Sequence, residues 1–363
     1  MRKVLMIAVL LTMMTGLAWA AKPFFVFEPG GGPGRVPDDF KVWHPHEDVE
    51  DYGESWFFQA KPSDKAMLFA MVSITNIGPG TYNGSIDIQY YGEDGNARRF
   101  HKDVKRENVN ASTDKLDVKV GNTHVWADKS GYRFTVDYPE VGMDLTITNG
   151  LPSLMFGDGA VKFNEDKSGE WTTGINVPMG VTKGTIAFGQ KTFDLGGKGY
   201  HDHGWSTMKM PDIFRQWDSL RIYGEKYTIV LHQQSMTKTW GGAINRYGVL
   251  GVDNKIVAPL RNFTFKPQDR RKTEKGKYDV PRAFAVDFTA KGYTVKGTVT
   301  YATHFDEIDV LGQVNAFLRA FIKAFYSKPF MHRYLADYDL TVTTSEGATE
   351  VIKGRGVVES NNF

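Results

Sequence analysis

The stretch that decides the fold class reads YRFTVDY at residues 132–138 and is followed by MDLTIT at residues 143–148. Apolar and polar side chains alternate in both segments. A period of two is typical of a β-strand that places one face on a core and the other in water. Similar segments recur along the chain at roughly ten-residue spacing, with turn residues between them, and strands do not alternate with helices. The sequence therefore predicts a mostly β protein built from antiparallel barrels or sandwiches.

One segment near the end departs from this strand pattern. Residues 309–325 repeat apolar side chains at helical spacing and predict a single late helix. We expect this helix to cover the opening of a barrel, to pack on a second barrel or to contact a membrane transiently. Two closing strands are predicted after it, at residues 334–342 and 350–358.

The chain divides into four expected regions. Residues 1–20 combine a basic start, an apolar stretch and a small-residue ending, which are the features of a signal peptide cleaved after Ala20. We therefore expect an exported protein, located in the periplasm or secreted. The Gly/Pro-rich residues 21–39 predict a linker, with ordered structure beginning only after it. The mature chain of about 340 residues is long enough for two domains, which we expect at residues 40–200 and 201–363.

Composition excludes several classes of function. The chain contains no cysteine, which excludes thiol catalysis, cysteine-bound zinc and iron–sulfur clusters. Its 44 Lys and Arg residues are nearly balanced by 42 Asp and Glu residues, so no nucleic-acid partner is expected. Aromatic residues make up 13% of the chain, and this share favours β-structure over a helical bundle.

The densest group of reactive side chains is the run GKGYHDHGWS, which contains five candidate site residues. If this run is a strand, His201, His203 and Trp205 lie on one face, and Tyr200 and Asp202 lie on the other. Two imidazoles and an indole on one face suit proton transfer or metal binding. They suit equally a packed aromatic seam whose histidines are hydrogen-bonded.

A metal site on this strand would begin with His201 and His203, whose spacing is used by strand-borne metal ligands. His232 and His304 are the candidates for a third ligand. Nothing in the spacing of these four histidines requires a metal, and we expect none.

A second group is the run ESWFF, which places Glu54 beside Trp56 and Phe58. An apolar pocket raises the pKa of a carboxyl group and allows it to act as a general acid. The alternative is a strand start at which Glu54 is solvated.

Several of these motifs resemble one known family. The segment YHDHGW at 200–205 is similar to a Tyr-x-Asp-His-x-Trp signature, and ESWFF at 54–58 is similar to a Trp-rich first strand. The runs RYLADY at 333–338 and GRGVVE at 354–359 resemble the last strand pair of the same family. The chain thus resembles the carotenoid 1,2-hydratase (hydroxyneurosporene synthase)-like, AttH-type two-domain proteins. That resemblance implies two lipocalin-like antiparallel β-barrel domains side by side, an apolar pocket between or within them, and no cofactor.

The resemblance also implies roles for individual residues. In the hydratases an acid protonates a C=C bond, and aromatic faces stabilise the resulting cation. The Asp, His and Trp of the signature match Asp202, His203 and Trp205, and Tyr247 matches a Tyr on a later strand. The expected catalytic residues are His203, Asp202, Trp205, Tyr247 and Glu54. The expected ligand-binding residues are Trp56, Phe58, Tyr200, His201 and Trp217.

Two functions remain open from the sequence. The first is an exported protein that binds a hydrophobic, isoprenoid or lipid-like ligand and transforms it by cofactor-free hydration, isomerisation or cyclisation. The second is a non-catalytic periplasmic lipid or isoprenoid carrier, which is favoured because Gly248 and its neighbours stand where the hydratases place an acid after Tyr247. An acid that points into the pocket near His203 and Trp205 favours the enzyme, whereas an acid held in a salt bridge favours the carrier.

Overall fold

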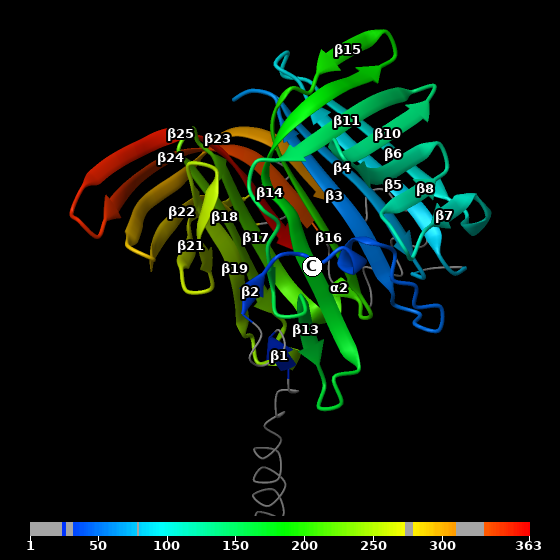
Figure 1. Cartoon of the computed structure of the whole chain (residues 1–363), viewed down its shortest axis with the longest axis horizontal. Helices are drawn as coiled ribbons and strands as arrows, with labels where there is room; N and C mark the ends of the chain where they lie inside the picture. Colours follow the sequence, from blue (N-terminus) through cyan, green and yellow to red (C-terminus); the bar gives the residue numbers. More distant parts are fainter. Residues whose placement is uncertain (1–23, 27–31, 78–79, 273–278, 310–329) are drawn as a thin grey trace, which may run out of the picture.

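The computed structural model describes residues 24–26, 32–77, 80–272, 279–309 and 330–363, and these residues form two curved antiparallel sheets that lie side by side (Figure 1). The predicted mostly β, lipocalin-like architecture is confirmed. The described helical segments are short: α2 (Met210–Ile213), η1 (Asp39–Lys41), η2 (Arg106–Asn108) and η3 (Lys238–Trp240). None of them is long and apolar enough to cross a membrane.

The first sheet has the strand order β6-β5-β4-β3-β16-β14-β11-β10-β9-β8-β7, with β1, β13 and β15 attached at its sides. It curls until β5 approaches β8, so that it nearly closes into a barrel. Its strands are β1 (Phe24–Val26), β3 (Gly53–Lys61), β4 (Met67–Thr75), β5 (Asn83–Tyr91), β6 (Ala97–Val104), β7 (Val109–Ala111), β8 (Asp117–Val120), β9 (Thr123–Asp128), β10 (Gly131–Tyr138), β11 (Val141–Asn149), β13 (Ala160–Phe163), β14 (Gly169–Phe188), β15 (Lys191–Asp194) and β16 (Gly197–Ser206). A separate short pair is formed by β2 (Pro33–Gly34) and β12 (Met155–Phe156).

The second sheet has the order β20-β19-β18-β17-β25-β24-β23-β22-β21. Its strands are β17 (Phe214–Tyr223), β18 (Tyr227–Met236), β19 (Ile244–Val252), β20 (Lys255–Leu260), β21 (Thr264–Lys272), β22 (Asp279–Ala290), β23 (Tyr293–Asp309), β24 (Phe330–Thr344) and β25 (Thr349–Asn362). The two predicted closing strands are therefore confirmed as β24 and β25, both longer than expected.

The alternating pattern that predicted the strands is realised in β10 and β11. Phe134 pairs with Leu145 on the inner face, and both side chains are fully buried. Arg133 and Asp144 pair on the outer face, where their side chains form an ion pair at 2.9 Å. A one-residue slip would exchange these faces, so the alternation also determines the register.

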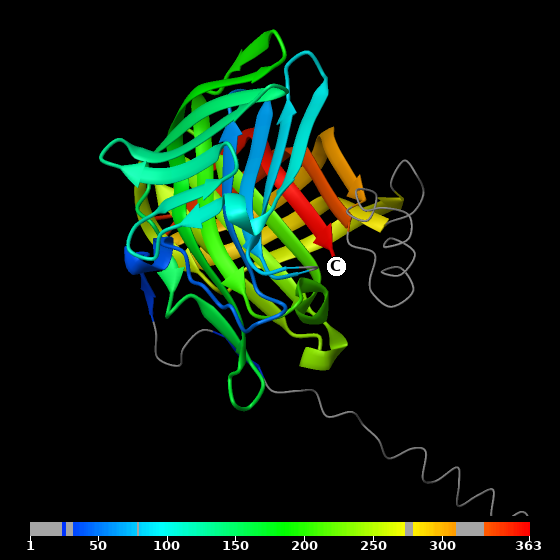
Figure 2. The same ribbon diagram turned by 90° about the vertical axis from the view of Figure 1, so that its right-hand side faces the viewer.

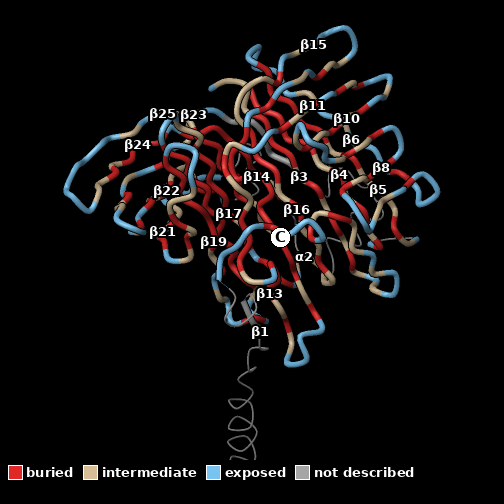
Figure 3. Tube along the Cα trace, viewed as in Figure 1, coloured by how far each residue is buried: buried red, intermediate tan, exposed pale blue. Residues whose placement is uncertain are grey.

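Three groups of buried side chains hold the molecule together (Figure 3). The first fills the first barrel and includes Trp56 and Phe134. The second fills the curve of the second sheet and includes Phe284. The third lies between the two sheets and includes Trp171 and Phe214. Because burial of large apolar side chains is the main stabilising term, the two sheets stabilise each other as well as themselves.

Strand β16 lies where the two sheets meet (Figures 1 and 2). It pairs with β3 on one side and with β14 on the other, so it belongs to the first sheet. The second sheet starts with β17 at Phe214. The domain boundary predicted at residues 200 and 201 falls inside β16, and the change from one sheet to the other comes between Ser206 and Phe214.

The N-terminal linker is partly folded, contrary to expectation. Within residues 21–39, β1 pairs with β13 and β2 pairs with β12. Val36 is also buried, because it packs with Phe40 against the first sheet. The signal peptide expected at residues 1–20 lies outside the described residues. The same holds for the helix predicted at 309–325, apart from Asp309, which ends β23.

Candidate functional site

The side chains of β16 alternate between two environments, as the sequence predicts. His201 and His203 point into the first barrel, where both are fully buried. Trp205 lies on the same face, stacked on His44 with ring centroids 3.9 Å apart. Tyr200 and Asp202 lie on the opposite face, toward the second sheet. The ten candidate residues are therefore divided between two sites and do not form one.

Inside the first barrel, Glu54 is enclosed by hydrogen-bond donors. His203 Nε2 lies 2.7 Å from Glu54 Oε1, and His44 Nδ1 lies 3.2 Å from the same oxygen. The Tyr52 hydroxyl and the His44 backbone N–H donate to Oε2. Burial alone would raise the pKa of Glu54, but the hydrogen bonds from His203, His44 and Tyr52 outweigh it and hold that pKa below its usual value. The pKa of Glu54 is thus lowered, whereas a general acid requires a raised pKa.

The aromatic residues predicted to bind ligand on this face pack against histidines instead. Trp56 stacks on His203 at 4.7 Å and 10° between ring planes, and Phe58 stacks on His201 at 4.0 Å and 17°. Burial lowers the pKa of His201 to about 3, so its ring is neutral. Its Nδ1 lies 2.9 Å from the Phe57 carbonyl oxygen. Trp56, Phe58 and His201 therefore lie in the packed core of the first barrel.

On the face between the sheets, four side chains form a hydrogen-bonded chain. Trp217 Nε1 donates to His232 Nδ1 at 3.4 Å. Because Nδ1 is the acceptor, the ring proton of His232 lies on Nε2, which is 3.2 Å from the Tyr200 hydroxyl. The Tyr200 hydroxyl donates to Asp202 Oδ2 at 2.7 Å. Tyr247 stacks on His232, with ring centroids 4.7 Å apart and 14° between the ring planes. Tyr200, Trp217 and Tyr247, all predicted site residues, therefore contact a histidine that the sequence indicated only as a candidate metal ligand.

Asp202 is the weak acid of the site. Burial raises its pKa to about 6, although the Arg221 guanidinium and the Tyr200 hydroxyl act in the opposite direction. Asp202 therefore exchanges its proton near neutral pH, whereas Glu54 on the neighbouring strand does not. The acid and Trp217 both line the same cavity.

A buried ionic network adjoins Asp202 and was missed in the sequence. Arg221 on β17 and Arg333 on β24 both donate to the carboxylate of Glu359 on β25, the latter from Nε at 2.7 Å. The Arg221 guanidinium also lies over the Tyr200 ring, 4.2 Å from its centroid. Arg221 lies between Leu220 and Ile222 in the sequence. Because a buried strand rarely places a cation between apolar residues without a partner, this position could have indicated a buried ion pair.

These groups border a cavity of about 410 Å³ between the sheets. Strands β3, β4, β14 and β16 of the first sheet line it together with β17, β24 and β25 of the second. Its apolar lining includes Phe57, Met71, Met208, Trp217, Met331 and Phe363. Its polar lining includes Ser55, Ser73, Asp202, Ser219 and Asn361. The cavity thus combines apolar walls with polar and charged groups at one region.

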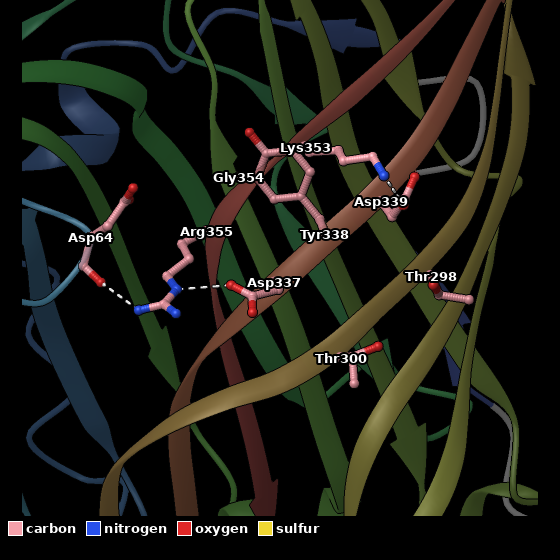
Figure 4. Close-up of a pocket in the computed structure, with 9 residues that line it drawn as sticks. All are labelled: Asp64, Thr298, Thr300, Asp337, Tyr338, Asp339, Lys353, Gly354 and Arg355. Carbon is pink, nitrogen blue, oxygen red and sulfur yellow. Dashed lines mark hydrogen bonds and ion pairs between the residues drawn. The ribbon is translucent and has the colours of Figure 1, made fainter.

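A second hollow of about 480 Å³ lies on the outer surface of the second sheet (Figure 4). Arg355 pairs there with Asp337 at 2.8 Å, and Lys353 pairs with Asp339 at 2.7 Å. Its remaining lining is mostly polar, including Thr298. The charged side chains of this hollow thus pair with one another across the strands.

Solved structures share this architecture. CghA superposes with a TM-score of 0.62 at 13% identity, covering 92% of this chain and 99% of that one. AttH from Nitrosomonas europaea superposes with a TM-score of 0.59 at 14% identity, covering 92% of this chain and 97% of that one. At these identities the likeness concerns the fold alone, and it supports the AttH-type part of the expected resemblance.

Sequence comparison gives the family. The "Ceramide-binding protein svf-1" of Neurospora crassa is 24% identical over 313 residues, which is 82% of this chain and 80% of that protein. The family model described as "Svf1 family" matches residues 38–361, which include most of both sheets and nearly all the residues that line the cavity between them. These matches do not support the carotenoid 1,2-hydratase part of the expected resemblance. The chain belongs to the Svf1 family.

Proposed function

We propose that this protein binds one neutral lipid of the ceramide class in the cavity between its two sheets and carries it unaltered. The observation that supports this most is the composition of the cavity: apolar walls around a few polar groups whose charges are internally balanced. A relative in Neurospora crassa is named as a ceramide-binding protein.

The apolar walls suit an acyl chain. Met71, Met208 and Met331 line the cavity together with aromatic rings. Methionine is unbranched and polarisable, so it adapts to flexible chains better than branched side chains do. The volume of about 410 Å³ lies within the range of small-molecule sites.

The polar groups suit a head that is neutral and hydrogen-bonding. The two cations, Arg221 and Arg333, already share the carboxylate of Glu359. Asp202 supplies a second acid beside Arg221. Because the cations are compensated, a phosphate head would find no free positive charge. The hydroxyl and amide groups of Ser73, Ser219 and Asn361 can pair with those of a ceramide.

The state of Glu54 favours a carrier over an enzyme. Glu54, the acid nearest His203, is held by hydrogen bonds from His203 and Tyr52. A carboxylate held in this way stabilises the fold and has no proton to give.

The proposal is tested with a short-chain ceramide carrying an NBD fluorophore, titrated into the purified full chain. We expect saturable binding of one probe per chain, displaced by unlabelled ceramide and recovered unchanged by mass spectrometry. Displacement by ceramide 1-phosphate at equal concentration would contradict the assignment of a neutral head, and failure to bind the probe would contradict the proposed ligand class.

A matched pair of variants locates the probe. Ser73→Trp places an indole in the cavity from β4, and should abolish binding. Thr146→Trp places the same side chain on the outer face of the first sheet, in β11, and should bind as the wild type does. Equal binding by both variants would exclude the cavity between the sheets.

A second function is favoured by one observation, the weak acid at the cavity wall. The carboxyl of Asp202, with a pKa raised to about 6, can deliver a proton to an unsaturated ligand near neutral pH. Incubation with an isoprenoid or lipid containing a C=C bond would then give a product heavier by one water or an isomer. Asp202→Asn should abolish that product while probe binding persists. If the wild type returns the ligand unchanged, this second function is excluded and the carrier function remains.

Export belongs to the same proposal, because residues 1–20 have the pattern of a cleaved signal peptide. N-terminal sequencing of the protein purified from its own host should begin at Ala21. A sequence that begins at Met1 or Arg2 would contradict export by this route.

A further inference from the structure

We propose that His44, Glu54 and His203 form a binding site for one divalent transition-metal ion inside the first barrel, on the face of β16 opposite Asp202. One ligand atom from each residue lies within 4.8 Å of the others. Asp202, the acid of the proposed lipid site, lies on the other face of β16, whereas Glu54 and Trp205 border both the cavity and this group.

The donor set comes from three separate elements. Glu54 is on β3, His203 is on β16, and His44 lies in the segment that precedes β3. Strand pairing places Trp56 opposite His203, which brings Glu54 to a diagonal position on the same face. Two imidazoles and one carboxylate are a common ligand set for Zn²⁺ and for Fe²⁺ in proteins.

The hydrogen bonds of His203 require a positive charge beside Glu54. Its Nδ1 lies 2.8 Å from the Phe40 carbonyl oxygen, which can only accept, so Nδ1 bears a proton. Its Nε2 then faces Glu54 Oε1 at 2.7 Å. A lone pair and a carboxylate oxygen repel at that distance unless a positive charge lies between them. In the ion-free contact that charge is a ring proton, and a metal ion that binds both atoms would take its place.

The surroundings of the three residues are those of an oriented metal site. Metal-bound histidines usually donate their other ring N–H to a carbonyl or carboxylate, as His203 does to Phe40. Ligating carboxylates are usually held by further hydrogen bonds. Trp43 Nε1 donates to the Tyr52 hydroxyl at 3.0 Å, which directs the hydroxyl proton of Tyr52 to Glu54. These contacts fix Glu54 and His203 before an ion enters.

His44 gives access to the site. Its side chain is 25% exposed, whereas those of Glu54 and His203 are fully buried. An ion can therefore reach the site past His44, and three protein ligands leave at least one coordination position open for water. A bound ion would join the segment at residues 40–44 to both β3 and β16.

The test is a titration of the chelator-treated full chain with Zn²⁺ alone and with Co²⁺ alone, followed by metal analysis after gel filtration. We expect one ion per chain. His44→Asn and His203→Asn should each lower the affinity at least tenfold, since each removes a ligand. His46→Asn is the matched control from the same loop and should bind as the wild type does.

A measurement on the wild type removes dependence on the stability of the variants. X-ray absorption of the zinc-loaded protein should show imidazole scattering from two histidines and only N/O ligands. The assignment is overturned if the wild type binds neither ion, if scattering shows no imidazole, or if His44→Asn and His203→Asn retain wild-type affinity.

Discussion

Two carboxylates on neighbouring strands have opposite acidities because their hydrogen-bond partners differ. Glu54 accepts from two histidines and a tyrosine, and its pKa is lowered. Asp202 accepts from Tyr200, and burial dominates, so that its pKa is raised to about 6. At the residue scale, the number of donors around a buried acid decides whether it is a structural anion or a proton donor.

The buried network around Glu359 gives a prediction about stability. Glu359→Gln removes the negative charge shared by Arg221 and Arg333 and leaves two buried guanidinium groups near each other. We expect the free energy of unfolding to fall by about 3–5 kcal/mol, measured by urea denaturation. The control is Asp339→Asn, which breaks an exposed ion pair with Lys353 at 2.7 Å and should cost less than about 1 kcal/mol. Equal losses in the two variants would contradict a buried role for Glu359.

His232 gives a prediction about pH. Burial, followed by the nearby Arg221 charge, lowers the pKa of His232 well below its usual value, and Tyr200, Trp217 and Tyr247 also face its ring. The unfolded chain therefore takes up this proton first as the pH falls through about 6.5, and stability drops by up to about 1.4 kcal/mol per pH unit.

The comparison with His232→Gln isolates this contribution. A glutamine can accept from Trp217 and donate to Tyr200 but does not titrate. Denaturation of both proteins between pH 7.5 and pH 5 should show the wild type losing stability relative to the variant. A difference that does not change with pH would mean that His232 titrates alike in the folded and the unfolded chain, and would contradict the lowered pKa.

At the element scale, β16 depends on a residue without a side chain. A Cβ at Gly204 would lie 2.3 Å from the Thr172 carbonyl oxygen on β14, which cannot move independently of its strand. Gly204→Ala should destabilise the protein by about 1–3 kcal/mol and weaken binding of the ceramide probe, because β14 and β16 both line the cavity. Gly142→Ala, in β11, meets no atom within 4 Å and serves as the control. Thermal melts of the two variants should separate them clearly, and coincident melts would refute the steric argument.

The same strand explains how far sequence reasoning reaches. Alternation predicted the strands and correctly divided His203 from Asp202, because side-chain direction follows from local geometry. It did not predict that Trp56 and Phe58 belong to a packed core, since that depends on which strands become neighbours. Arg333 and Glu359 were missed for the same reason. Their partners come from distant strands, and a local sequence pattern does not determine the register between distant strands.

At the scale of the whole molecule, the two sheets are expected to unfold together. Trp171, Phe214 and Tyr247 form one buried group across the junction, and Leu335 packs with Phe69 beside it. Separating the sheets would expose these side chains to water at a cost of roughly 1.5–3 kcal/mol each. Near-ultraviolet and far-ultraviolet circular dichroism should therefore report a single shared transition in urea. Two resolved transitions would show that each sheet is stable alone.

Strand β16 pairs with β3 although His203 and Glu54 are 149 residues apart, and Arg333 contacts Gln89 across 244 residues. During synthesis, β3 gains its final neighbour β16 only after more than half of the chain has been made. Contacts so distant in sequence slow folding, because the chain loses the entropy of closing a long loop before the contact can stabilise it. Until then, other chains can contact the edge of β3 that later pairs with β16 and the apolar residues of the incomplete cavity. A chaperone that shields β3 until β16 emerges would therefore have more effect on the yield of this protein than one acting at either terminus.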